Sequence, residues 1–527
     1  MKQRLFSITI AGAMAFFAMN LVSCSKDLNR EPPNAITASE VFSTPAGALQ
    51  ALAKVYGAFA LTSSTGPSNG DLGGIDPGTS DFVRLLWDVN ELTTDEGVCA
   101  WNDPGVPDLH NLDWNSSNVI LLGLYARIMF QVTVANSYIQ QASSANFTGQ
   151  DKTNLGYYVA EARFLRAFDY WEMMDLFGNS PFITDKQPIG SIPTYATRAQ
   201  LFAYVESELL SLDSANALVP ARQNEYGRAD QGAVWALLSR MYLNADVYLG
   251  SGNDHFTQAI TYANKVIGAG YTLHPVYQDL FLADNNLNNP EQILSIPYDG
   301  TNTQNYGGTT FIINAAIGGS MTPANYGVPG GGWAGNRVTS NIPNLFGSGS
   351  TDVRNLFYTN GQSLAIADIG TFTDGYAVTK WQNVTSTGAI PAGASTFCNT
   401  DFPLFRLAEQ YLIYAEATLR GGSGGTQAQA LTYMNALRQR AYGNNSGNYT
   451  TFALQDVLNE RGMELYWECF RRTDLIRYGL FTSGNYLWPW KGGVSSGTGV
   501  SANLNIFPLP ATDLNTNPNL IQNPGYN

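Results

Sequence analysis

The sequence has few charged residues, and the basic ones are the scarcer kind. Charged residues make up 13% of the 527 positions, about half the share that is typical of soluble globular proteins. Lys and Arg number 28 against 42 Asp and Glu, so the formal net charge is −14. A nucleic-acid-binding protein needs clustered Lys and Arg to neutralise phosphates. The composition therefore argues against nucleic acid as a partner.

Histidine and cysteine are also scarce, which limits the chemistry available. The chain has three histidines and four cysteines. Three of the cysteines lie far apart without C-x-x-C spacing: Cys99, Cys398 and Cys469. At most one disulfide can form among them, and neither a zinc site nor a disulfide framework is indicated. We expect these three cysteines to be core residues and expect no resident cofactor.

Nucleotide-binding signatures are missing as well, although glycine is abundant. The 52 glycines include no G-x-x-x-x-G-K-[ST] motif, and no G-x-G-x-x-G leads from a clear strand into a helix. Apolar material is plentiful, with 44% hydrophobic and 12% aromatic residues, which excludes global disorder. The length suggests two or three structural units, or one large unit.

The first residues form an export signal. Lys2 and Arg4 precede an apolar run over residues 5–19, which is too short to span a bilayer as a stable helix. The run ends in LVSC, which resembles the lipobox of bacterial lipoproteins and implies acylation of Cys24. Buried acyl chains add about 0.8 kcal/mol of membrane affinity per CH₂. We predict a signal peptide over 1–23 and a lipidated tether over 24–40; an ordinary secretory signal with an incidental cysteine is the alternative.

Two helix-rich regions flank a glycine-rich middle. Hydrophobic spacing predicts helices over the following ranges: 118–141, 154–177, 197–213, 228–248, 254–268, 403–420, 426–442 and about 452–468. Residues 271–400 contain glycine-rich turns and short β-prone pieces such as 292–296. We predict a mainly α protein with irregular TPR-like helix pairs and a loop-rich lobe with short β elements. Its parts are 41–270 (N-terminal helices), 271–400 (lobe) and 401–527 (C-terminal helices and an ordered tail).

Several segments resemble motifs of the SusD/RagB family, in the family's order along the chain. They are VAEARFLRA at 159–167, LFGNSP at 176–181, NERGMEL at 459–465, ECFRRTDLIRYG at 468–479, FPLP at 507–510 and QNPGY at 522–526. The sequence departs from the family pattern at two places. Asn179 and Ser180 stand where the family usually has an acidic residue. Gly462 lies within a predicted helix, where glycine lowers helix stability by roughly 1 kcal/mol relative to alanine.

The resemblance implies a fold, a location and a partner. Members of this family are outer-membrane lipoproteins of Bacteroidetes-type bacteria that face the exterior and capture glycans. Each pairs with a SusC-like, TonB-dependent transporter and closes over it as a lid. The resemblance therefore implies a SusD-like α-helical scaffold that is not an enzyme. It would hold an oligosaccharide or polysaccharide, contact outer-membrane lipid through Cys24 and deliver its ligand unaltered.

A glycan offers flat CH faces and edges of hydroxyl groups, which proteins bind with exposed aromatic rings and planar polar groups. Trp101 and Trp333 lie in turn-rich segments and resemble aromatic positions that the family uses for stacking. Further aromatic candidates are Tyr306 and Tyr298, with Tyr326 behind them. For the hydroxyl edges the candidates are Asn102, Asp76 and Arg84. We predict that these residues form one aromatic arc.

Other readings remain open. The ligand could be an oligopeptide, as in RagB-type proteins, or the protein could bind only a protein partner. A glycoside hydrolase needs two carboxylates across a cleft, and Asp95, Glu96 and Asp103 are the only ones in the aromatic loops. Glu460, Glu464 and Glu468 share a helix face and, with Arg461, Arg471 and Arg472 nearby, indicate a salt-bridge network instead. Glu409 and Glu416 are expected to be solvated or paired. A structural calcium ion in the Asp/Asn-rich loop 284–291 is a further expectation, although no EF-hand pattern is present.

Overall fold

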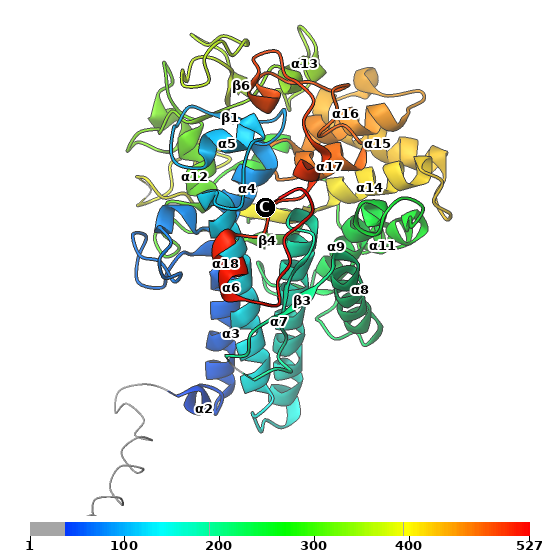
Figure 1. The fold of residues 1–527 in the computed structure, drawn as a ribbon. Helices are drawn as coiled ribbons and strands as arrows, with labels where there is room; N and C mark the ends of the chain where they lie inside the picture. The colour runs from blue at the N-terminus through cyan, green and yellow to red at the C-terminus, as the bar shows by residue number, and fades with distance from the viewer. Residues whose placement is uncertain (1–36, 189, 394, 527) are drawn as a thin grey trace, which may run out of the picture.

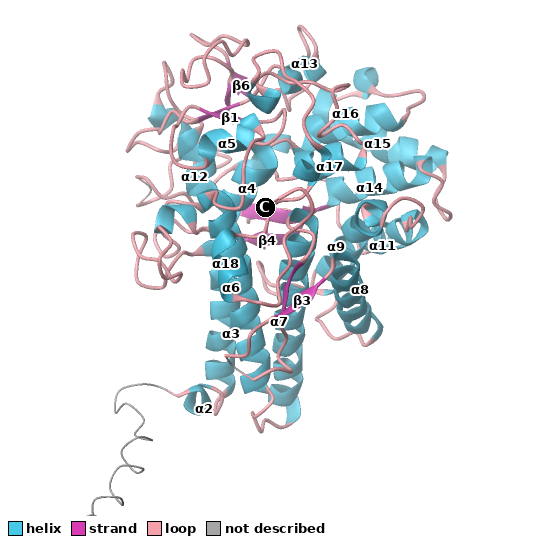
Figure 2. Ribbon diagram, in the orientation of Figure 1, coloured by secondary structure: helices cyan, strands magenta, loops and turns pink. Residues whose placement is uncertain are grey.

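The computed structural model describes residues 37–188, 190–393 and 395–526. Cys24, the signal peptide and most of the predicted tether lie outside these residues. The described chain is mainly helical, with a few short strands set among long loops (Figure 2). This confirms the predicted fold class.

Three long helices run side by side at the N-terminal end of the chain (Figure 1). They are α3 (Pro45–Ala60), α6 (Val119–Ala142) and α7 (Gly149–Leu176), and α6 packs against both others. The side chain of Asn118 begins α6 by accepting hydrogen bonds from the backbone N–H groups of Ile120 and Leu121, which would otherwise be unpaired. By length and composition α6 could cross a membrane, but 61% of its most apolar stretch is buried inside the protein, as expected of a core helix.

The later helices continue this packing in chain order. Each of the following contacts the next: α7, α8 (Arg198–Ser214), α9 (Gln231–Leu243), α11 (Phe256–Gly268), α14 (Leu407–Leu419) and α15 (Gln427–Tyr442). The helix predicted over 228–248 is divided at Asn244, after which the short α10 (Ala245–Leu249) begins. The last predicted helix is α16 (Leu454–Leu465), followed by α17 (Arg471–Arg477). Periodicity thus located the predicted helices to within a few residues, but α3, α4 (Phe82–Glu91) and α17 were not predicted.

The glycine-rich middle contributes strands that pair across long stretches of sequence. The predicted strand is β4 (Gln292–Ile296), which pairs antiparallel with β8 (Phe402–Arg406). Two-residue strands β1 (Val98–Cys99) and β5 (Asn336–Arg337) pair in the same sense. A helix that the sequence did not predict, α12 (Gly308–Ala315), lies within the middle and packs on α4 (Phe82–Glu91). The boundaries at 270 and 400 stay predictions, although β4 and β8 join residues on either side of 400.

The C-terminal tail is ordered coil with the short helix α18 (Ala511–Thr516), in agreement with the sequence prediction. Its end is fixed to the helical body by specific hydrogen bonds. The Trp114 indole donates to the Tyr526 hydroxyl over 3.0 Å, and the Phe507 N–H donates to the Leu176 carbonyl over 2.8 Å. The family-like motif at the C-terminus therefore has a structural role.

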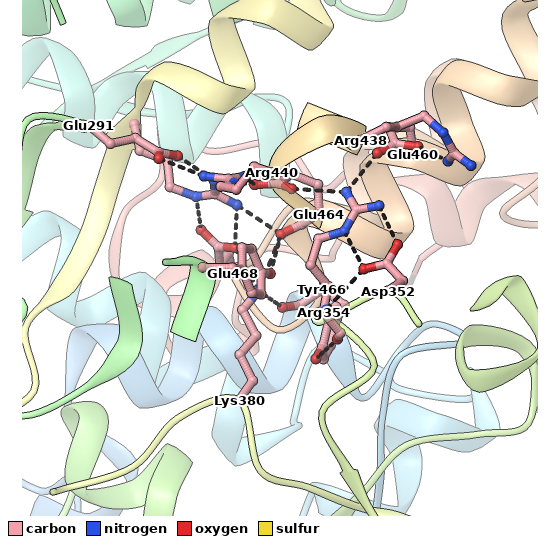
Figure 3. Close-up of polar contacts among 12 residues, drawn as sticks. Glu291, Asp352, Arg354, Lys380, Arg438, Arg440, Glu460, Glu464, Tyr466 and Glu468 are labelled. Atoms are coloured by element: carbon pink, nitrogen blue, oxygen red, sulfur yellow. Dashed lines mark hydrogen bonds and ion pairs between the residues drawn. The ribbon is translucent and has the colours of Figure 1, made fainter. Parts of the chain in front are cut away.

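A buried ionic network connects the C-terminal helices (Figure 3). Glu464, fully buried on α16, contacts Arg406 at 2.6 Å, Arg354 at 3.0 Å and also Arg440. Burial raises its pKa, but the arginines more than reverse this, so the pKa lies well below its usual value. Glu468 contacts Lys380 at 2.7 Å and Arg406 at 2.7 Å. The glutamate row is therefore a salt-bridge network, as predicted.

The partners in this network differ from those that the sequence suggested. Arg461 and Arg471 pair instead with Asp474 and Asp95, at 2.6 and 2.8 Å. Arg472 donates to the backbone carbonyl of residue 505. The sequence suggested that the glutamates pair with arginines close to them in the chain. In the structure, Glu464 instead contacts arginines from other segments, at positions 354, 406 and 440. Glu409 and Glu416 are both buried and paired, with Arg240 and with Arg477 and Arg420 respectively.

Candidate ligand-binding site

The pairing of β1 with β5 brings two distant loops together. In its register Val98 lies opposite Arg337 and Cys99 opposite Asn336. The Ala100 N–H then donates to the Gly335 carbonyl over 2.8 Å, which extends the pairing by one residue. Because the strands are antiparallel, β1 ends where β5 begins, so the segment with Trp101 after β1 meets the segment with Trp333 before β5.

The two tryptophans form one platform. The Trp101 indole N–H donates to the backbone carbonyl of Trp333 over 3.0 Å, and the ring centroids are 6.4 Å apart with planes tilted by 45°. Gly335 leaves room for the Trp101 ring, because a Cβ there would lie 2.5 Å from Cε2 of the indole. The Trp333 N–H donates to the Asn314 carbonyl at the end of α12 over 2.7 Å. These contacts therefore fix the Trp101 ring and the main chain of Trp333.

Both tryptophans line a pocket of about 880 Å³. This volume is within the roughly 300–1,000 Å³ of small-molecule sites. The polar members of its lining include two predicted residues, Asp76 and Arg84, together with Thr79 and Asp103. The apolar part of the lining comes from the segment after Trp101 and the first turn of α6: Pro104, Val106, Val119, Ile120 and Leu122. The structure thus brings four of the predicted site residues into one hollow.

Asp76 and Arg84 are held in place by local structure. Asp76 caps the 3-10 turn Pro77–Thr79 by accepting from the Gly78 N–H over 2.8 Å. Arg84 on α4 lies with its guanidinium 4.6 Å from the Phe311 ring centroid and its Nε 3.7 Å from Asp88. Burial raises the pKa of Asp88 to about 7, although Arg84 opposes the shift. The raised pKa of Asp88 weakens its charge pairing with Arg84 near neutral pH.

Two further rings extend the platform. Tyr306 is 43% exposed, and its ring centroid is 6.5 Å from that of Trp333. Phe397, partly buried, follows at 5.2 Å from Tyr306. The order Trp101, Trp333, Tyr306, Phe397 makes a continuous row of rings. Phe397 was not among the predicted residues although its loop resembles theirs in composition, and only the fold places it beside Tyr306.

Four other predicted residues are not part of this pocket's lining: Tyr306, Tyr298, Asn102 and Tyr326. Tyr298 is only 6% exposed, because its N–H donates to buried Asp401 over 2.6 Å and its ring packs under Gly308. The prediction that Tyr298 offers a ring to the ligand is therefore wrong. Asn102 is exposed but does not line the pocket, and Tyr326 is partly buried elsewhere. The ligand contacts of the remaining candidates stay predictions.

The carboxylates that a hydrolase would need are mostly unavailable. Asp95 and Glu96 are buried; Asp95 pairs with Arg471, and Glu96 accepts from the Trp467 N–H over 2.9 Å. Asp103 does line the pocket, together with Asp76. The Asp95/Glu96 pair thus belongs to the core of the protein and not to the pocket.

A metal site receives no support from the described residues. Among them, no three His, Cys, Asp or Glu side chains are grouped so as to hold an ion. In the loop 284–291, the carboxylate of Asp284 accepts from the N–H and the hydroxyl of Ser386, over 2.8 and 2.7 Å. Calcium binding in this loop stays a prediction. Cys99, Cys398 and Cys469 are free thiols, the first two of them fully buried.

Comparisons with known proteins identify the family. A family model described as "SusD family" matches residues 354–526, and one described as "Starch-binding associating with outer membrane" matches residues 89–243. The chain is 33% identical to the starch-binding protein SusD of Bacteroides thetaiotaomicron, over 99% of each chain. It is 25% identical to the SusD-like protein P2 of Formosa agariphila, over 96% of this chain and 98% of that one. The chain therefore belongs to the SusD family.

Solved structures share the fold. The surface glycan-binding protein A of Bacteroides thetaiotaomicron in complex with laminarihexaose superposes with a TM-score of 0.69 at 20% identity, covering 90% of this chain and 98% of that one. A laminarin-binding SusD-like protein gives a TM-score of 0.69 at 21% identity, covering 91% and 99%. At these identities the likeness is one of fold.

Proposed function

We propose that this protein is a cell-surface lipoprotein that captures oligosaccharides on the platform of Trp101, Trp333 and Tyr306. The observation that carries the proposal is the pocket of about 880 Å³ that is lined by both indoles and by Asp76 and Arg84. Aromatic faces suit the CH faces of a pyranose, and planar polar groups suit its hydroxyl edges. Relatives named for starch binding and for laminarin binding support a glucan as the first ligand to try.

The rest of the assignment follows from family membership and from the N-terminal sequence. Cys24 would carry the acyl chains that anchor the protein in the outer membrane, facing outward. A SusC-like, TonB-dependent transporter would receive the ligand. No catalytic step is proposed, and the ligand leaves unaltered. An oligopeptide ligand is the second candidate, since Asp76, Asp103 and Arg84 could bind peptide termini or charged side chains.

The test of capture without catalysis uses purified protein and two glucan series, maltooligosaccharides and laminarioligosaccharides, with a mixed oligopeptide set beside them. Calorimetry is expected to show saturable binding of at least one glucan series, with no new reducing ends after prolonged incubation. Sustained release of reducing ends would contradict the non-enzymatic assignment. Binding of the peptides alone would overturn the glycan assignment.

Anchoring has its own test. Cells expressing Cys24→Ala should release the protein from the membrane fraction, because no acyl chain can attach. A Cys99→Ala variant is the matched control and should stay with the membrane, since Cys99 is a buried free thiol. Membrane retention of the Cys24 variant would refute the lipidation.

A further inference from the structure

A second hollow, of about 510 Å³, lies along α6 next to the pocket that the two tryptophans line. We call it the α6 groove, because its lining on this helix extends from Leu122 to Thr133. Leu122 lines both hollows. The loop after α3 also borders both, since Leu72 lines the groove and Gly74 and Ile75 line the tryptophan pocket. The two hollows are therefore neighbours that share part of their walls.

One face of α6 serves both hollows. Its solvent-accessible lining residues recur at helical spacing: Val119, Leu122, Ala126, Met129, Phe130 and Thr133. The span from Val119 to Thr133 measures about 21 Å along the helix axis, at about 1.5 Å per residue. A ligand chain that leaves the tryptophan pocket at Leu122 therefore meets an open continuation of the same helix face.

The lining of the α6 groove combines apolar surface with hydroxyl groups. Its accessible apolar part includes Leu122, Met129 and the ring of Phe130. Exposed hydroxyl groups come from α6 and from α18: Thr133, Thr512 and Thr516. A sugar has CH faces for the first kind of surface and hydroxyl edges for the second. An aliphatic chain would strip water from the threonine hydroxyls without replacing the lost hydrogen bonds.

Charge in the α6 groove favours a neutral ligand. Asp513 is the only carboxylate in the described lining, and no Lys, Arg or His belongs to it. The hydroxyl group of Tyr125 already donates a hydrogen bond to the Asp513 carboxylate. The groove therefore offers an ionic ligand no opposite charge of its own apart from one carboxylate that is already hydrogen-bonded.

The borders of the α6 groove are fixed by contacts within the protein. Beside Leu72, the Asp71 N–H donates to the carbonyl of residue 62 over 2.7 Å, and the Asp71 carboxylate pairs with Lys54 at 3.0 Å. On the other border, the Ala511 N–H at the start of α18 donates to the Ser116 carbonyl over 2.9 Å. A groove whose borders are already ordered loses little conformational entropy when a ligand binds.

We infer that the α6 groove holds the continuation of an oligosaccharide whose other part lies in the tryptophan pocket. The inference rests on the proposed function, because it assumes that glycans enter that pocket. A chain that fills both hollows buries more apolar surface than one confined to the first, so its affinity is higher. The protein therefore selects neutral oligosaccharides long enough to pass Leu122, and short sugars bind more weakly.

The experiment is calorimetry on full-length mature protein with maltooligosaccharides and laminarioligosaccharides, each series from the disaccharide to the octasaccharide. In the wild type, affinity should rise at least fivefold from the shortest member that binds to the octasaccharide. In Ala126→Arg the long side chain obstructs the groove, so octasaccharide affinity should fall to that of the shortest bound member. Affinity for the shortest member should not change, which also shows that the variant is folded.

Phe130→Ala tests the groove without adding a charge or filling space. It removes part of the apolar surface, so octasaccharide affinity should fall about threefold while the shortest bound member is unaffected. Ala428→Arg is the matched control for Ala126→Arg, because Ala428 is exposed on α15 and lines neither hollow. This control should keep the wild-type dependence on chain length.

Failure of the inference differs from failure of the proposed function. Equal wild-type affinity for every bound length, or an unchanged octasaccharide affinity in Ala126→Arg, would overturn the inference alone. If the wild type bound no oligosaccharide, the proposed function would fail and the inference with it. Loss of the apolar dye ANS in Ala126→Arg, with all oligosaccharide affinities unchanged, would overturn the inference by assigning the groove to an apolar partner.

Discussion

The indole N–H of Trp101 donates to the backbone carbonyl of Trp333 across 232 residues of sequence, over 3.0 Å. This hydrogen bond joins the two tryptophans into one unit before any ligand arrives. The β1–β5 pairing and the contact of Trp333 with α12 fix the same unit from the backbone side. A platform that is already ordered loses little conformational entropy on binding.

The hydrogen bond between these residues can be tested separately from the ring. Trp101→Phe keeps an aromatic face but removes the N–H donor, so the platform should loosen. We expect oligosaccharide affinity to fall about three- to tenfold, which corresponds to roughly 0.7–1.4 kcal/mol and to one neutral hydrogen bond. Calorimetry measures the change. Trp235→Phe, which removes an indole bonded to Asp213 away from the pocket, is the control; equal losses in both variants would contradict the role of the Trp101 bond.

Substitution of Gly335 disturbs the platform without changing either tryptophan. In Gly335→Ala the new Cβ would lie 2.5 Å from the Trp101 indole, so the ring must move. Oligosaccharide affinity should fall at least tenfold while the thermal unfolding transition stays cooperative.

Gly156→Ala is the control for the Gly335 experiment. Gly156 lies in α7 with nothing within 4 Å of the added Cβ. This change should leave binding intact and add up to about 1 kcal/mol of stability through helix propensity. Undiminished binding by Gly335→Ala would show that the position of the Trp101 ring does not matter.

Hydrophobic spacing predicted the long helices from α6 onward, because each has a sustained apolar pattern, but it missed α3 (Pro45–Ala60) and α4 (Phe82–Glu91). The residue range 118–141 corresponds closely to α6, Val119–Ala142. The short helix α12 and the two-residue strands β1 and β5 carry no such pattern, and their pairing depends on contacts across more than 200 residues.

The same contrast applies to the site. Trp101, Trp333 and Tyr306 were predicted from polar, glycine-rich loops and a family resemblance, and the structure sets their rings in one row. Tyr298 has a similar local context, yet its backbone bond to Asp401 draws it into the core. Local sequence does not contain that distinction. The apolar wall from the first turn of α6 was also missed, since its residues look like core residues.

We expect the free energy of unfolding to fall strongly when one carboxylate of the buried ionic network is removed. Glu464→Gln takes away the charge that faces Arg354, Arg406 and Arg440, all of them buried. Breaking a buried ion pair on one side typically costs about 3–5 kcal/mol. Urea unfolding should show a loss of this order.

Glu225→Gln is the matched control for Glu464→Gln, because Glu225 is an exposed partner of Arg228. An exposed pair contributes at most about 1 kcal/mol, so the loss should be small. Similar losses in the two variants would mean that the buried network does not stabilise the C-terminal helices.

Stability should also depend on pH through Glu172 on α7. Burial raises its pKa to about 8, with Asp175 adding to the shift and Arg240 opposing it. The pKa of Glu172 is higher in the folded state than its ordinary value of 4.5. Protonation of Glu172 therefore stabilises the folded state, and this stabilisation is fully present below about pH 4.5. It is lost as the pH rises through about 8.

Glu172→Gln removes this titration while preserving size. Between pH 6 and pH 9.5 the free energy of unfolding should therefore fall less in the variant than in the wild type, as measured by urea unfolding at each pH. Glu225→Gln should leave the wild-type pH dependence unchanged. An identical pH dependence in the wild type and Glu172→Gln would rule out the proposed titration.

The central claim is tested most directly by isothermal calorimetry of the double variant Trp101→Ala/Trp333→Ala with the oligosaccharide that the wild type binds best. Removing both indoles should abolish measurable binding while circular dichroism shows an unchanged helical signal. If the correctly folded double variant bound that oligosaccharide with wild-type affinity, the indole platform would not be the place where this protein captures its ligand.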